Sequence, residues 1–109
     1  MKRAFRSAVV AVAVLANAGA VTACGPRPGR HELEIRELAF PAPPEGVRAG
    51  DTLVWVNSDL VPHTVSAEGV WESGALAPGD SFKIALGTAK AFHYLCDYHP
   101  TMRGTLVVR

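Results

Sequence analysis

From residue 31 to the end of the chain, apolar and polar residues alternate in several short runs, and no stretch repeats its apolar positions with the period of a helix. The runs are rich in β-branched and aromatic residues, and turn signals containing glycine or proline separate them. One run is apolar on both faces, as a central sandwich strand would be. The expected strands are ELEIRELAF (32–40), TLVWVN (52–57, apolar on both faces), SFKIAL (81–86), AFHYLC (91–96) and TLVVR (105–109).

The first of these runs predicts an interruption. Leu33 and Ile35 share one face, whereas Leu38 and Phe40 follow out of phase, so the strand needs a bulge or a bend between the two pairs. Short strands with turns roughly every ten residues predict an all-β sandwich or barrel as one domain over residues 31–109.

The first thirty residues have a different character. A basic start, MKRAFR, precedes an apolar run and the junction VTAC, which ends at Cys24. This order is typical of a cleaved signal peptide, and the apolar run is short for a membrane span. VTAC resembles the bacterial lipobox, so we expect cleavage after residue 23, lipid on Cys24 and a flexible tether over residues 24–30. The alternative is an ordinary signal peptide with a stray cysteine.

Cleavage changes the charge balance. It removes three of eleven basic residues and leaves eight against ten acidic ones, a net charge near −2. No basic run remains to neutralise phosphates, so nucleic acid is not an expected partner. The sequence also lacks a glycine-rich phosphate loop and a Gly-x-Ser-x-Gly elbow. We therefore expect no enzymatic activity.

The stretch CDYHPTM, residues 96–102, carries the candidate chemistry. Cys96 ends a strand on the same face as Phe92 and Tyr94, His99 follows after three residues, and Met102 after three more. One tight loop can bring thiolate, imidazole and thioether to one point. If Cys24 carries lipid, Cys96 is unpaired in an oxidising compartment, which favours a buried or metal-bound thiol.

A second imidazole is expected from His63, which follows the central strand and a proline-containing turn. Two imidazoles, one thiolate and a weak thioether form the ligand set of a blue-copper site. Zinc competes for histidine and cysteine, but methionine is a poor zinc ligand. We expect no role at the site for His31, at the end of the tether, or for His93, which alternates out of phase with Cys96.

The chain resembles the cupredoxin family, and within it the amicyanin and plastocyanin group. The resemblance runs from about Leu33 to Val108 and rests on AFP, V-x-AGDTLVWVN, PHTV, PGDSF and FHYLCDYHPTMRGTLVV. It implies a Greek-key β-sandwich with one Cu(I)/Cu(II) ion in a type 1 site. It maps the ligands onto His63, Cys96, His99 and Met102, and places Asn57, Thr64 and Pro100 around them.

Thr64 departs from the family pattern. Many members carry asparagine directly after the first histidine, where it ties the ligand loops together. The main-chain N–H of Thr64 is still expected to reach the Cys96 sulfur. Its shorter side chain leaves the hydrogen bond between the loops an open question.

The resemblance and the lipobox together predict a monomeric one-electron carrier, anchored by lipid at the extracytoplasmic face of a membrane in the cell envelope. A redox donor and a redox acceptor would bind it transiently. A copper chaperone or storage protein is the alternative, and a zinc-bound or metal-free adhesion module is a weaker one. An apolar rim around His99 is the expected contact surface for partners; its residues are Leu60, Val61, Pro62, Tyr98 and Pro100.

Overall fold

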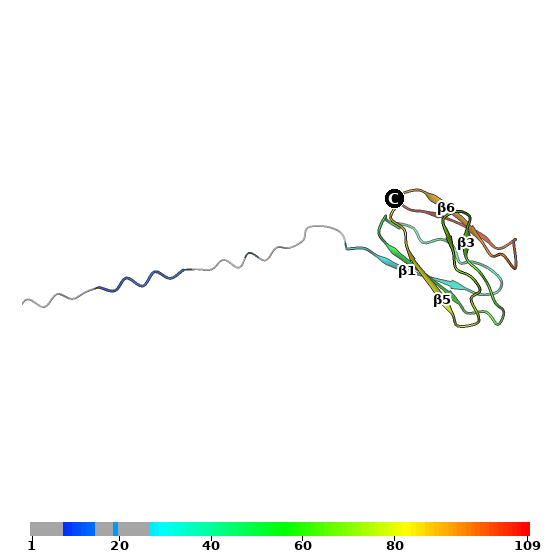
Figure 1. The fold of residues 1–109 in the computed structure, drawn as a ribbon, viewed down its shortest axis with the longest axis horizontal. Helices are drawn as coiled ribbons and strands as arrows, with labels where there is room; N and C mark the ends of the chain where they lie inside the picture. Colours follow the sequence, from blue (N-terminus) through cyan, green and yellow to red (C-terminus); the bar gives the residue numbers. More distant parts are fainter. Residues whose placement is uncertain (1–7, 15–18, 20–26) are drawn as a thin grey trace, which may run out of the picture.

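The computed structural model describes residues 8–14, 19 and 27–109, and residues 27–109 hold all its strands. Two sheets face each other as a sandwich (Figure 1). The three-stranded sheet has the order β1-β2-β5 and the four-stranded sheet the order β4-β3-β6-β7. β1 and β2 run parallel, and the other neighbours are antiparallel. The strands are β1 (Arg30–Ile35), β2 (Thr52–Asn57), β3 (Ser66–Ala67), β4 (Trp71–Glu72), β5 (Ser81–Ala85), β6 (Ala91–Leu95) and β7 (Arg103–Val107).

The core lies between the sheets and is built largely of aromatic rings. Trp55 of β2 packs on Trp71 of β4 and on Tyr94 of β6, with ring centroids 5.7 and 5.6 Å apart. Tyr94 pairs with Gly104 of β7, and a methyl group at Gly104 would collide with the Tyr94 ring. Because Gly104 has no side chain, the ring of Tyr94 fits against it, two residues before Cys96.

The interruption expected after Ile35 is confirmed. β1 ends there, and Arg36 and Ala39 form a tight turn through two main-chain hydrogen bonds of 3.3 and 3.1 Å. The central residues, Glu37 and Leu38, have φ angles of 55° and 56°. This left-handed conformation costs a residue with a side chain about 1–2 kcal/mol.

Strands β3 and β4 were not predicted from the sequence. Each has two residues, which is too short for an alternating pattern to show. They pair with each other, and Ser66 of β3 pairs with Leu95 of β6, so they extend the second sheet beside the end of the strand that leads to Cys96.

The N-terminal edge of the domain lies at the end of β2 away from Asn57. β1 begins at Arg30, so His31 is a strand residue and does not end a tether. The buried carboxylate of Asp51 accepts hydrogen bonds from the N–H groups of Gly29 (2.7 Å) and Arg48 (3.0 Å), and lies 2.9 Å from Nε2 of His31. Gly29 is thus already attached to the folded domain.

Residues 1–7, 15–18 and 20–26, which include Cys24 and most of the expected signal peptide, lie outside the described residues. Within the part of the chain that is described, no helix has the length and apolar character needed to cross a membrane.

Candidate metal centre

His63 is held by main-chain bonds on both sides of its loop. Its N–H donates to the carbonyl of Leu76 (3.1 Å), and the Leu76 N–H donates back (2.7 Å). The buried amide of Asn57, at the end of β2, donates to the carbonyls of Val61 (2.9 Å) and Leu76 (2.8 Å). The chain from β2 to Leu76 is therefore folded around one side chain, which explains why Asn57 matters although it lies six positions before His63. The His63 side chain is fully buried.

The loop from Cys96 to Met102 is closed by its own backbone. The Cys96 N–H donates to the carbonyl of Met102 (3.1 Å), and the Met102 N–H donates to the carbonyl of His99 (2.8 Å). Cys96 is a free thiol with no exposed surface, Met102 is 5% exposed, and His99 is half-buried. The loop thus presents sulfur inward and leaves His99 nearest to solvent.

His63, Cys96 and His99 meet at one point. Their ligand atoms all lie within 4.8 Å of one another. Sγ of Cys96 is 3.7 Å from Nδ1 of His63 and 3.8 Å from Nδ1 of His99. Metal–sulfur and metal–nitrogen bonds of about 2.3 and 2.0 Å at trigonal angles would separate sulfur from nitrogen by about 3.7 Å. The distances from the sulfur to the two nitrogens therefore match those expected around one bound metal ion.

The Cys96 thiol is set up to ionise. Burial by itself raises its pKa, but the hydrogen bond from the Thr64 N–H and the polar contacts with the imidazoles of His63 and His99 outweigh it. They lower the pKa from 9.0 to about 6. A thiolate is the form that binds metal, so the site is prepared for an ion at neutral pH.

Asp59 contacts the ring nitrogen of His63 that faces away from Cys96. Oδ2 of Asp59 lies 2.7 Å from Nε2 of His63. Burial raises the pKa of Asp59, but hydrogen bonds from the Leu38 N–H, the His63 imidazole and the Glu37 N–H lower it overall. An ionised carboxylate only accepts, so Nε2 carries the proton and the lone pair of Nδ1 faces the metal position. Sequence reasoning missed Asp59. Its spacing of four residues before His63 is a weak signal.

Thr64 answers the question left open by the sequence. Its N–H donates to Sγ of Cys96 (3.4 Å), as expected, and its hydroxyl oxygen accepts from the Asp97 N–H (2.8 Å). The Asp97 carboxylate in turn accepts from the Ser66 hydroxyl (2.9 Å). The shorter side chain thus still links the two ligand loops.

The other expected residues lie as follows. The Pro100 carbonyl accepts from Nε of Arg103 (2.9 Å), which braces the end of the ligand loop. His93 points away from the site and hydrogen-bonds Thr105 (2.9 Å). Every residue of the apolar rim is exposed, and Leu60 reaches 94% exposure.

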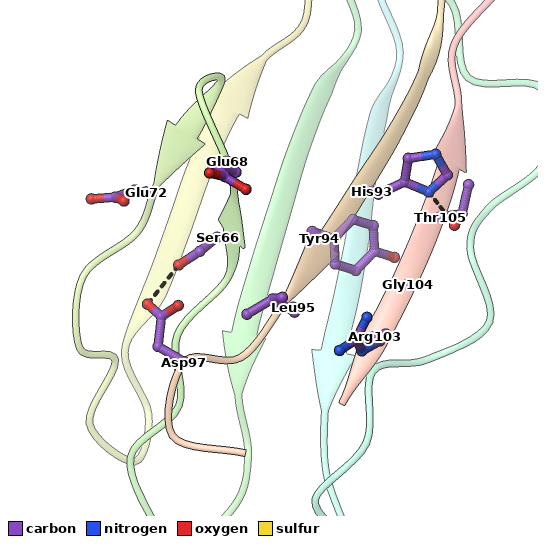
Figure 2. Close-up of a pocket in the computed structure, with 10 residues that line it drawn as sticks. All are labelled: Ser66, Glu68, Glu72, His93, Tyr94, Leu95, Asp97, Arg103, Gly104 and Thr105. Atoms are coloured by element: carbon purple, nitrogen blue, oxygen red, sulfur yellow. Dashed lines mark hydrogen bonds between the residues drawn. The ribbon is translucent and has the colours of Figure 1, made fainter. Parts of the chain in front are cut away.

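A groove of about 490 Å³ lies elsewhere, on the outer face of the four-stranded sheet (Figure 2). The groove is not lined by His63, Cys96 or His99. The groove residues are Ser66, Glu68, Glu72, His93, Tyr94, Leu95, Asp97, Arg103, Gly104 and Thr105. The candidate chemistry is therefore in the packed end of the sandwich and not in this hollow.

Comparison with known proteins agrees with this geometry. The model of a cupredoxin-like domain matches residues 8–108. Amicyanin-alpha of Methylorubrum extorquens is 32% identical over 109 residues, covering 94% of this chain and 91% of the relative. Plastocyanin of Scenedesmus fuscus is 30% identical over 86 residues, covering 66% and 88%. The crystal structure of amicyanin from Paracoccus versutus superimposes with a TM-score of 0.67 at 26% identity, covering 80% of this chain and 87% of that one.

Proposed function

The chain belongs to the cupredoxin family, its cofactor is one copper ion in a type 1 site, and we propose that it carries single electrons between redox proteins of the cell envelope. We propose His63, Cys96, His99 and Met102 as the copper ligands. The observation that carries the proposal is the packing of three donor atoms within 4.8 Å of one another, with the thiol fully buried.

This arrangement suits electron transfer because the protein holds its ligands before and after the exchange. Cu(I) prefers soft sulfur and few ligands, whereas Cu(II) prefers nitrogen and more ligands. His63 is fixed by the bonds around Leu76, and the loop from Cys96 to Met102 is closed by its own main chain. Little has to move when an electron arrives, so the cost of reorganisation is small.

The electron would pass through the exposed edge of His99. This imidazole is half-buried, whereas His63 is fully buried. We propose that the apolar rim lies on that side of the loop; three of its members, Leu60, Val61 and Tyr98, are 94%, 41% and 53% exposed. A small apolar patch of this kind fits transient contact with a redox donor and then a redox acceptor.

The cellular location is part of the same proposal. The order of basic start, apolar run and VTAC junction supports cleavage after residue 23 and lipid on Cys24. The carrier would then stay at the extracytoplasmic face of a membrane as a monomer. A copper chaperone or store would use the same ligands, but such proteins favour exposed, exchangeable sites, whereas Cys96 has no exposed surface.

Visible absorption of the copper-loaded protein tests the proposal. We expect an intense blue band, which Cys96→Ser abolishes because oxygen replaces the thiolate while the β-sandwich remains folded. A second measurement follows the oxidation of the Cu(I) protein by a redox protein in a single turnover. A copper-loaded protein without the band, or one that passes copper rather than electrons to its partner, would point to the chaperone or store instead.

A further inference from the structure

The Asp59 carboxylate lies between the ligand His63 and a turn that belongs to neither ligand loop. Oδ1 accepts from the Glu37 N–H (2.6 Å), and Oδ2 accepts from the Leu38 N–H (2.9 Å). The same Oδ2 lies 2.7 Å from Nε2 of His63. One carboxylate thus holds both the turn Arg36–Ala39 and the buried ligand, which are distant in the sequence.

The backbone of this turn is unusual. Glu37 and Leu38 are successive residues with φ angles of 55° and 56°, a conformation that favours glycine. Their side chains are exposed and do not explain the conformation. The conformation does direct two successive N–H groups toward one carboxylate, which makes an anion-binding concavity. Backbone strain of this kind persists where the surroundings over-determine it, and such positions cluster at functional sites.

We propose that the turn Arg36–Ala39 is a positioning element for the copper ligand His63, and that it acts through Asp59. Two N–H bonds fix the carboxylate, and the fixed carboxylate fixes the proton of His63 on Nε2. Nδ1 is then left with its lone pair directed toward Sγ of Cys96, where the ligands meet. The inference rests on the proposed ligand role of His63.

The consequence for the copper site has a definite sign. A carboxylate acceptor makes the imidazole a stronger donor, which favours Cu(II) over Cu(I) and lowers the reduction potential. Losing a supporting partner of a ligand commonly costs tenfold or more in metal affinity. A tenfold loss of Cu(II) affinity alone raises the potential of a one-electron couple by about 59 mV.

Three variants of the mature protein separate the turn from its side chains. Asp59→Asn keeps the shape of the side chain but removes its charge. Leu38→Pro removes one N–H, and its ring cannot adopt a positive φ. Leu38→Gly is the matched control, because glycine keeps the N–H and relieves the strain. Insertion of one glycine between Glu37 and Leu38 displaces both N–H groups without a proline ring, and replaces Leu38→Pro if that variant does not fold.

Two readouts are measured on each variant: the reduction potential, and the tautomer of His63 from ¹⁵N NMR of the Cu(I) and metal-free protein. We expect Asp59→Asn to raise the reduction potential by the amount that corresponds to about a tenfold loss of Cu(II) affinity. Leu38→Pro or the insertion should shift it the same way and weaken the Nε2–H signal. Leu38→Gly should keep both readouts and raise the melting temperature. In the Asp59→Asn background, the turn variants should have no further effect on the potential.

The proposal is overturned if the folded turn variants keep the parent potential and tautomer while Asp59→Asn changes them. It is equally overturned if Asp59→Asn changes neither readout. Failure of the proposed function looks different, since the parent itself would then show no blue copper band. Even in that case, the tautomer of metal-free protein decides whether the turn positions His63.

Discussion

The hydroxyl oxygen of Thr64 accepts a 2.8 Å hydrogen bond from the N–H of Asp97, which lies 33 positions later in the chain. The main-chain N–H of Thr64 donates to the sulfur of Cys96 at the same time. One residue therefore contacts the other ligand loop through both its backbone and its side chain. Thr64 therefore fixes the loop of His63 relative to the loop of Cys96.

Replacing Thr64 with valine should loosen the two loops. Thr64→Val keeps the shape but leaves the Asp97 N–H without its protein acceptor, at a cost of about 1 kcal/mol in unfolding free energy. Copper should also dissociate faster, because the loops separate more easily. Urea denaturation and copper transfer to a chelator measure the two effects. Thr64→Ser, which retains the hydroxyl, should restore both, and equal behaviour of the valine and serine variants would contradict this role.

Adding a methyl group at Gly104 should disturb the core beneath the metal centre. The new atom would meet the ring and hydroxyl of Tyr94, both held between the sheets. We expect Gly104→Ala to lower the unfolding free energy by about 1–3 kcal/mol. Gly87→Ala is the matched control, because nothing lies within 4 Å of a methyl group there. Equal urea midpoints for the two variants would show that Tyr94 can move aside.

Asp51 should make the stability of the domain depend on pH in the acid range. The Arg48 N–H, the His31 imidazole and the Gly29 N–H lower its pKa from 3.8 to about 2, although burial opposes them. The folded protein thus binds this proton less readily than the unfolded chain does. The ionised carboxylate therefore makes its full contribution to stability above pH 3.8, and this contribution is lost as the pH falls through about 2.

Thermal melts of the metal-free protein test this dependence. Asp51→Asn should melt at a lower temperature than the parent near neutral pH, and the difference should shrink as pH falls through that window. Glu45→Gln is the control, because it also removes one negative charge but at an exposed residue. A constant difference between parent and Asp51→Asn at every pH would mean that ionisation of Asp51 contributes nothing.

The state of Cys24 decides the proposed anchor. If the lipobox is used, mass spectrometry of the native protein should find residue 24 at the N-terminus, carrying lipid, and the protein should fractionate with membranes. Cys24→Ala should leave the precursor uncut at this junction. A mature start at another residue, or an unmodified thiol at Cys24, would reject the anchor without affecting the copper proposal.

The ligand loop was readable from the sequence because its geometry is local. Cys96, His99 and Met102 lie in seven residues, and the strict alternation of residues 91–96 already turned Cys96 toward the core. The other strands of five or six residues were likewise visible, since burial of one face imposes a period of two. β2 was visible instead as a short run that is apolar on both faces. The break after Ile35 followed from the same rule.

Tertiary structure alone decided which distant groups meet. The link from Asp59 to the turn at Glu37 depends on how two connections fold at one end of the sandwich. The contact of Tyr94 with Gly104 depends on the register of two strands, and His31 meets Asp51 only because β1 and β2 run side by side. A pattern along the chain records which face a residue buries; it does not record which partner the other strand or loop supplies, and that choice depends on packing of the whole domain.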